Sequence, residues 1–285
     1  MTVLMCLLSD QHIPNLLAAH HFKPDKLVLI ETLGMAKKSA STNLLNALRC
    51  GGLDYAKHCH IEPLEQEDNL GAIRRCLHKA YAVFPSDDWI ANITGGTKPM
   101  SIAAYEFFNA LGSRLIYVNA AAPNRFIALD GKSEEICSYR PSIKEFLLGY
   151  GFDSLKPDKD IQDSEIRAEN WWECARAIAA SNQGRNLLKF DSHDRMTRAR
   201  QKGLQLEAKQ FPVIPEFSAF AKDCFGLTIA GESYRGYLDK RAVCFFTGEW
   251  LEIFIWGLLR QHSGALKIWD VRLGLHPGKI IPQTE

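Results

Sequence analysis

The segment NITGGTKPM at residues 92–100 has the residue types of an anion-binding turn. It follows an apolar run, and we expect Thr97 to be the N-cap of a helix with Pro99 in its first turn. Backbone N–H groups and the dipole at a helix start attract negative charge, and glycines allow a close approach. Thr94, Thr97 and Lys98 add two hydroxyls and one cation. The segment predicts a phosphate or nucleotide cradle; the alternative is an ordinary strand-to-helix turn.

Spacing excludes two familiar phosphate sites. Lys98 follows Gly-Gly-Thr directly, so there is no GxxxxGK[ST], and the first apolar run ends in Ser-Asp-Gln rather than GxGxxG. The sequence therefore favours neither ATP hydrolysis nor dinucleotide redox chemistry. Polar residues at strand ends instead predict a ligand site at one edge of a parallel sheet. The residues expected to line it are Ser9, Asp10, Gln11, Thr32, Gly34, Thr94, Gly95, Gly96, Thr97, Lys98 and Asn119.

The elements that must position these residues alternate along the first 150 residues. Short apolar runs separated by amphipathic stretches predict βαβ units around a mainly parallel sheet, in a Rossmann-like α/β domain over 1–152. Strands are expected at 3–8, 27–31, 55–61, 89–93 and 115–119, with an antiparallel edge at 126–129 and 136–139. Helices are expected at 14–19, 36–49, 70–82, 98–111 and 142–148.

The sequence of the rest of the chain predicts three further segments. Residues 153–164 are polar, contain a proline and have no periodicity, which predicts a linker. Helices at 165–180 and 216–225 and a hairpin within 227–246 predict a small α+β, winged-helix-like connector over 165–246. The last segment, 247–285, is expected to form an apolar helix at 248–260 and a strand at 265–273.

Composition limits the possible classes of protein. The 285 residues are 46% hydrophobic and 24% charged, which excludes small disulfide-stapled, disordered and coiled-coil proteins. The net charge of +1 is too small for binding nucleic acid by bulk charge. Eight cysteines without a CxxC pair are typical of thiols in a reducing cytoplasm. The apolar run at 3–8 is too short for a signal peptide or membrane span, so no membrane partner is expected.

Two motifs together resemble a known family. The Ser-Asp-Gln turn at 9–11 and the TGGTKPM turn at 94–100 resemble the CARF sensor domains of type III CRISPR systems, which act in antiviral defence. The TGEWLE segment at 247–252 resembles the helix that opens the restriction-endonuclease-like domain of the CRISPR ancillary nucleases activated by cyclic tetra-adenylate. The resemblance implies a cytoplasmic homodimer with the ring nucleotide on its two-fold axis. It also implies a Mn- or Mg-dependent nuclease that cuts single-stranded DNA or RNA.

The nuclease motif is incomplete in this sequence. Enzymes of the PD-(D/E)xK type hold their metal between an Asp and the Glu of a following ExK strand. Only Glu252 carries over as a catalytic carboxylate, and no ExK follows it. Asp270 is the one nearby candidate for the missing Asp. We therefore expect little or no cutting by this chain alone; a truncated product, a broken gene and a natural sensor-only form are all compatible with the sequence.

Other candidates have ordinary structural explanations. His58 and His60 share a strand face near Cys76 and His78, but no second spaced pair completes a zinc set. A basic stretch, Arg195, Arg198, Arg200 and Lys202, is interleaved with acids and favours a solvated face.

Two alternative functions stay open. A CARF domain that cleaves its own ligand would be a ring nuclease, and a true winged helix would make the protein a ligand-controlled transcription regulator. The ring size of the activator and the choice between DNA and RNA are not specified by the sequence.

Overall fold

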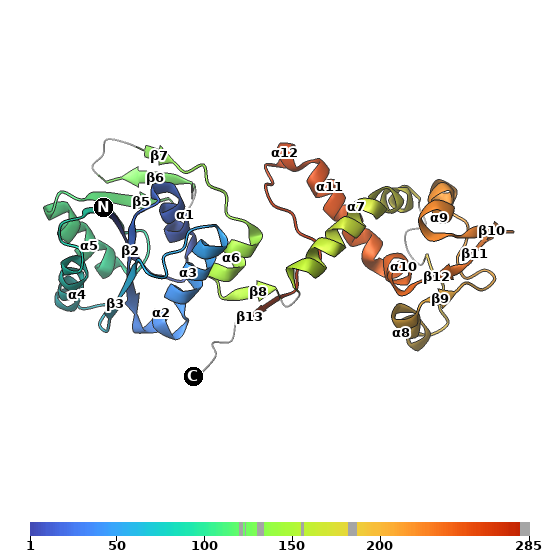
Figure 1. The fold of residues 1–285 in the computed structure, drawn as a ribbon, viewed down its shortest axis with the longest axis horizontal. Helices are drawn as coiled ribbons and strands as arrows, with labels where there is room; N and C mark the ends of the chain where they lie inside the picture. Colours follow the sequence, from blue (N-terminus) through green and yellow to red (C-terminus); the bar gives the residue numbers. More distant parts are fainter. Residues whose placement is uncertain (120–121, 123, 130–133, 155–156, 182–186, 280–285) are drawn as a thin grey trace. The chain divides into compact units, whose positions relative to one another are not determined.

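The computed structural model describes residues 1–119, 122, 124–129, 134–154, 157–181 and 187–279 (Figure 1). The chain divides into two compact units. The first comprises residues 1–155 and 276–285, and the second comprises residues 156–275.

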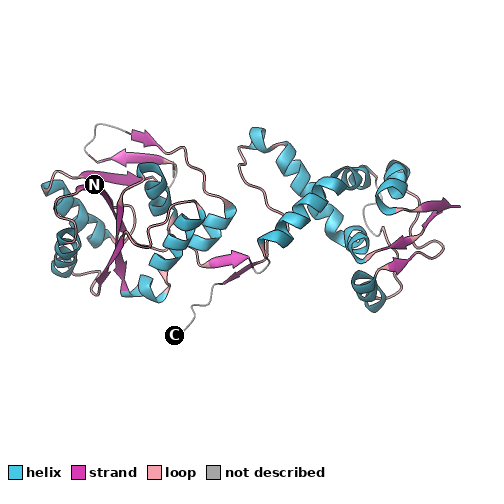
Figure 2. Ribbon diagram, in the orientation of Figure 1, coloured by secondary structure: helices cyan, strands magenta, loops and turns pink. Residues whose placement is uncertain are grey.

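The first unit is built on a seven-stranded sheet in the order β3-β2-β1-β4-β5-β6-β7 (Figures 1 and 2). The first five strands are parallel and the last two form an antiparallel edge, as expected. Their bounds are β1 (Thr2–Leu7), β2 (Lys26–Thr32), β3 (Cys59–Leu64), β4 (Asp88–Asn92), β5 (Arg114–Val118), β6 (Arg125–Ala128) and β7 (Glu134–Ile136).

Helices cover both faces of this sheet because β1 is apolar on both sides. Leu4, Cys6 and Leu8 pack with helices α1, α3 and α6, while Val3 and Met5 pack with α4 and α5 on the opposite face. The α/β prediction with a mainly parallel sheet is therefore confirmed. The helices are α1 (Ile13–Phe22), α2 (Leu33–Lys37), α3 (Ala40–Cys50), α4 (Leu70–Ala82), α5 (Lys98–Ala110) and α6 (Ile143–Gly149).

Two predicted elements of this unit have different bounds. The strand expected at 55–61 is β3, which begins at Cys59, because Tyr55 turns inward and donates its hydroxyl to the Pro24 carbonyl oxygen at 3.0 Å. The helix expected at 36–49 is two helices, because Ser39 between them adopts a left-handed φ of 55°.

The second unit is mainly helical and has its own core. Two helices, α7 (Asp158–Ala180) and α11 (Trp250–Gln261), cross each other (Figure 1). Gly257 lies at the crossing, where a Cβ would overlap the indole ring of Trp172. The remaining elements are α8 (His193–Lys202), β9 (Leu204–Gln205), η1 (Pro215–Phe217), α9 (Ser218–Phe225), β10 (Thr228–Ala230), β11 (Ser233–Arg235), β12 (Tyr237–Leu238), α10 (Lys240–Cys244), η2 (Phe245–Glu249) and α12 (Ser263–Leu266).

Two predictions in the second half are wrong in detail. Within the predicted linker 153–164, α7 already begins at Asp158, because Asp158 and Asp160 in its first turn favour a helix start despite the polar sequence. The strand expected at 265–273 does not form: α12 ends before Lys267, which has a φ of 55°, and the residues after it are irregular. The hairpin expected within 227–246 is present as β10 and β11. The roles given to the segments 165–246 and 247–285 stay predictions, and residues 155–156 and 280–285 lie outside the described residues.

Residues 240–261 form a helical stretch that contains an 18-residue window with a mean hydropathy of 1.5, long and apolar enough to cross a membrane by composition. Of this window 39% is buried, and the buried side chains, among them Phe245, Ile253 and Trp256, belong to the core of the second unit. That burial gives a structural reason for the apolar composition, which by itself is weak evidence for a membrane span.

The chain returns to the first unit near its end. Strand β13 (Pro277–Lys279) pairs antiparallel with β8 (Phe152–Ser154), the strand that precedes the second unit in sequence.

Candidate ligand site at the carboxyl edge of the first sheet

The order of strands places two predicted segments side by side. From β1 the sheet extends through β2 to β3 on one side and through β4 to β5 on the other. Open α/β sheets bind ligands at the point where the strand order reverses, outside the carboxyl ends of the strands. The turn 9–11 follows β1, and the loop 94–98, which includes the first residue of α5, follows β4 and Ile93. A Cβ at Gly95 would lie 3.3 Å from Ser9 Oγ, so the two segments meet.

Each glycine of the loop is required for a different structural reason. A Cβ at Gly95 would overlap the backbone carbonyl oxygen of Leu7 in β1, so only glycine lets the loop lie against that strand. Gly96 has a φ of 72°, which glycine adopts at little cost. The sequence prediction attributed both glycines to a close approach by a ligand. The structure shows that Gly95 permits a close approach by the protein's own backbone.

A buried amide network fixes the start of the loop. The side-chain nitrogen of Asn92 donates to Asn15 Oδ1 at 2.8 Å, and Asn92 Oδ1 accepts from the Thr94 hydroxyl at 2.6 Å. Thr94 Oγ1 in turn accepts the backbone N–H of Val118 in β5 at 2.8 Å. The Thr94 hydroxyl therefore has no further proton to donate to a ligand. Its role in the structure is to join the loop to β5.

The end of the loop leaves several donors unpaired. Thr97 is the N-cap residue of α5, as predicted, and its hydroxyl donates to the Glu67 carbonyl oxygen at 3.0 Å. Among the described residues, the backbone N–H groups of Gly95, Gly96 and Lys98 donate no hydrogen bond, and the exposed Lys98 ammonium has no partner. Orphan N–H groups beside a helix start and one unpaired cation are the elements of an anion site.

The other predicted site residues lie at the same edge with different roles. Ser9 Oγ accepts the Gln11 backbone N–H at 3.3 Å, which shapes the turn, and Asp10 forms an ion pair with Lys38. Thr32 is the N-cap of α2, where its hydroxyl oxygen accepts the Met35 N–H at 3.3 Å. Asn119 directly follows β5 and is exposed.

A cavity of about 600 Å³ adjoins the loop, and we call it the α5 pocket. Tyr105 and Tyr117 in its wall were missed by the sequence analysis. The periodicity of α5 was the available signal for Tyr105, whereas Tyr117 belongs to an apolar strand and gives no such sign. The lining residues are Ile93, Thr94, Gly96, Lys98, Ser101, Ile102, Tyr105, Tyr117 and Leu129.

His12 is a third residue that the sequence analysis missed. It follows Gln11, and both ring nitrogens are buried without a hydrogen-bond partner among the described residues. Its ring packs edge-on against Tyr150, with 4.2 Å between the ring centroids. Burial lowers the pKa of His12 to about 4, so the ring is neutral at pH 7.

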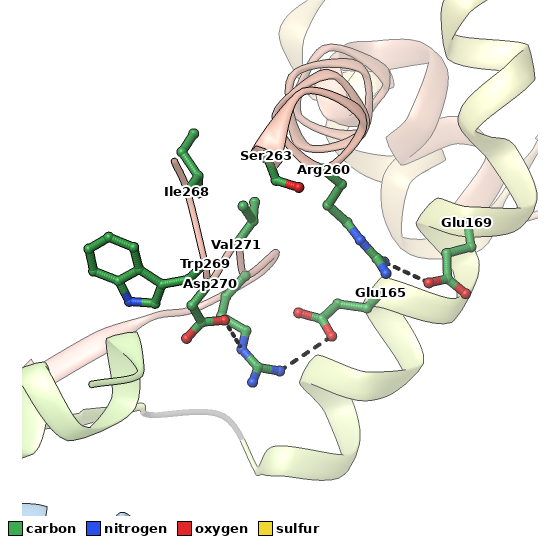
Figure 3. Close-up of a pocket in the computed structure, with 9 residues that line it drawn as sticks. Glu165, Glu169, Arg260, Ser263, Ile268, Trp269, Asp270 and Val271 are labelled. Atoms are coloured by element: carbon green, nitrogen blue, oxygen red, sulfur yellow. Dashed lines mark hydrogen bonds and ion pairs between the residues drawn. The ribbon is translucent and has the colours of Figure 1, made fainter. Parts of the chain in front are cut away.

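The second unit does not bring the predicted nuclease residues together. Asp270 lines a cavity of about 470 Å³ (Figure 3), and Glu252, exposed on α11, does not line it. Asp270 Oδ1 pairs with Arg272 Nε at 3.0 Å, and Arg260 pairs with Glu169 at 2.6 Å. Three carboxylates and two guanidinium groups leave this cavity net negative, which disfavours a nucleic-acid backbone.

No group of three or more His, Cys, Asp or Glu side chains that could hold a metal ion occurs within the described part of the chain. The described residues of the second unit therefore do not fit the Mn or Mg site of a complete nuclease.

Some basic side chains of helix α8 pair with other residues of the same chain. Arg195 pairs with Asp191 at 3.2 Å and with Glu207, and the Arg200 guanidinium donates to Thr247 Oγ1 at 2.8 Å. Two of the four basic residues in the predicted stretch are thus engaged in the fold, which weakens the case for a DNA-reading helix.

Three solved structures share the fold of this chain. Can2 from Sulfobacillus thermosulfidooxidans, solved in complex with cyclic tetra-adenylate, is 22% identical with a TM-score of 0.60, over 93% of this chain and 68% of that one. The protein VC1899 from Vibrio cholerae is 14% identical with a TM-score of 0.69, over 99% of this chain and 74% of that one. A type III CRISPR defence DNA nuclease activated by cyclic oligoadenylate is 20% identical with a TM-score of 0.53; the match covers 99% of this chain and 37% of that one.

No curated protein matches the sequence. A family model does match it: residues 3–146, just over half of the chain, match the model of the Card1 CARF domain. These residues include the turn 9–11, the loop 94–98 and all seven strands of the large sheet except Thr2 of β1. The chain therefore belongs to the Card1 CARF domain family.

Proposed function

We propose that this chain senses a cyclic oligoadenylate, with cyclic tetra-adenylate as the ligand, at the carboxyl edge of the first sheet. One observation carries the proposal: the loop 94–98 presents unpaired backbone N–H groups and the unpaired Lys98 ammonium at the point where the strand order reverses. The structure of Can2 in complex with cyclic tetra-adenylate supports this choice of ligand within the shared fold.

A homodimer is the assembly that suits this ligand. A ring of four phosphates carries four negative charges, while each chain offers one ammonium group, that of Lys98, where the loop borders the α5 pocket. Two copies related by a two-fold axis would meet the ring with two such cations and two sets of N–H groups. Asp10 opposes anion binding, and its ion pair with Lys38 offsets part of that repulsion.

We further propose that ligand binding controls a metal-dependent nuclease, using Mn or Mg, in relatives that carry a complete catalytic set. In this chain Glu252 is the one carried-over carboxylate, and the described residues do not complete a metal site. We therefore expect little or no cutting by the chain alone. Degradation of single-stranded DNA or RNA by the purified chain with Mn²⁺ and cyclic tetra-adenylate would contradict this expectation.

The sensing proposal is tested by thermal unfolding with cyclic tri-, tetra- and hexa-adenylate. A ligand present at about 100 times its dissociation constant stabilises the folded state by about 2.7 kcal/mol. We expect that stabilisation with the tetra-adenylate ring and its loss in Lys98→Ala. Lys57→Ala, which removes an exposed lysine in the turn before β3, is the matched control. Equal stabilisation of the Lys98→Ala and Lys57→Ala variants would refute the assignment of the loop.

The same incubation distinguishes a sensor from a ring nuclease. Conversion of the ring to linear di-adenylate without added metal would show that the chain degrades its own signal.

A further inference from the structure

The α5 pocket is lined by apolar and aromatic side chains that are not buried in the core of the sheet. Ile102, Tyr105 and Tyr117 are 54%, 39% and 40% exposed. On the same helix, the core-facing Met100 and Phe108 are fully buried. Helix α5 thus has a second apolar face that points away from the core. An occupant that removed this face from water would bind favourably.

The side chains on this face of α5 change from charged at the start of the helix to aromatic further along it. Lys98, Ser101, Ile102 and Tyr105 are spaced i, i+3, i+4 and i+7, so they lie on one side of α5. The charged end of the series adjoins the loop with unpaired N–H groups, and the aromatic end lies about two helical turns away. Tyr117 of β5 lines the same cavity. A molecule with an anionic group at one end and a flat aromatic ring at the other matches this order.

We propose that the α5 pocket is the base subsite of the cyclic oligoadenylate site: an adenine of the ring stacks against Tyr105 and Tyr117 while its phosphate lies at the loop 94–98. This inference rests on the proposed function and extends it, since it names the part of the ligand and the side chains that recognise it. The cavity of about 600 Å³ has the size and apolar lining of small-molecule sites. Aromatic side chains are common stacking partners for nucleobases.

A second copy of this chain is the competing occupant, because an apolar helix face is also suited to a dimer interface. Contiguity favours the nucleotide: Thr94, Gly96 and Lys98 belong both to the loop and to the lining of the cavity. A ligand whose phosphate contacts the loop therefore has its base within reach of the pocket. The experiment includes the second copy as an outcome.

Calorimetric titration of the full chain with cyclic tetra-adenylate tests the stacking. Loss of one aromatic stacking partner weakens nucleotide binding by about 5- to 150-fold, so we expect that loss in Tyr105→Ala and in Tyr117→Ala. Tyr105→Phe and Tyr117→Phe keep the ring and should bind within about threefold of the wild type. Leu111→Ala is the matched control, since Leu111 is exposed at the end of α5 but does not line the pocket. Equal thermal midpoints without ligand confirm that the variants fold.

A second readout detects the base directly. In a ring with 2-aminopurine in place of one adenine, stacking on tyrosine quenches fluorescence, and the alanine variants should lose this quenching while the phenylalanine variants keep it. Alanine variants that bind and quench like the wild type would overturn the base subsite and leave the proposed function intact. So would a loss of self-association in the ligand-free alanine variants by sedimentation velocity, because a second copy would then cover the pocket. A wild-type chain that binds no ring would overturn the proposed function as well.

Discussion

Replacing Gly95 with alanine places a methyl group against the backbone of β1. The new Cβ would overlap the Leu7 carbonyl oxygen and would lie 3.3 Å from Ser9 Oγ, so the loop and the turn must move apart. Backbone atoms of a central strand cannot yield as a flexible side chain does. Overpacking of this kind costs about 1–3 kcal/mol, and we expect Gly95→Ala to lower the stability of the first unit by about 2 kcal/mol.

The displaced loop should lose ligand affinity as well. The N–H groups of Gly95 and Gly96, which have no backbone partner, and the ammonium of Lys98 could contact one anion together only if the loop keeps its shape. We expect urea unfolding to show the stability loss and calorimetry to show at least tenfold weaker binding of cyclic tetra-adenylate, equivalent to about 1.4 kcal/mol.

Gly264→Ala is the control for the Gly95 substitution, because a Cβ at Gly264 meets no atom within 4 Å. It should leave both stability and affinity unchanged. A Gly95→Ala chain as stable as the wild type and with the same affinity would refute the argument that contact with β1 sets the shape of the loop.

Two further predictions concern the buried histidine and the helix crossing. Burial lowers the pKa of His12 in the folded state from 6.5 to about 4. The stability that this provides is complete above pH 6.5, and about 3 kcal/mol of it is lost as the pH falls towards 4, because the unfolded chain binds the proton first. Urea unfolding at pH 7.5 and pH 4.5 should show this loss of stability and a smaller loss in His12→Leu; an equal loss in both proteins would contradict the prediction. Gly257→Ala should destabilise the second unit by about 2 kcal/mol, because the new Cβ would overlap Trp172. Adding Trp172→Leu to the Gly257→Ala chain should recover part of that stability; if the thermal midpoints show that the losses of the two substitutions simply add, the two residues do not contact each other.

The sequence predicted those parts of the site that depend on local pattern. Thr97 as the N-cap of a helix follows from the order of residues around one helix start, and the structure shows it. The polar ends of β1 and β4 could also be located, because an apolar run that ends in polar residues indicates the end of a buried strand.

The parts that were missed depend on contacts between distant residues. The Thr94 hydroxyl was predicted to face an anion, yet it is held by Asn92 and by Val118, 24 residues later. Tyr117 faces the α5 pocket only because β5 lies beside β4 in the sheet. The start of α7 was missed because the acidic residues Asp158 and Asp160 of its first turn have the polar composition of a linker.

A crystal structure of the full chain with cyclic tetra-adenylate is the most direct test of the central claim. The account predicts a ring phosphate within hydrogen-bonding distance of the Gly95, Gly96 and Lys98 backbone N–H groups, with the Lys98 ammonium beside it. A ring bound elsewhere on the chain, with the loop 94–98 free of ligand, would contradict it.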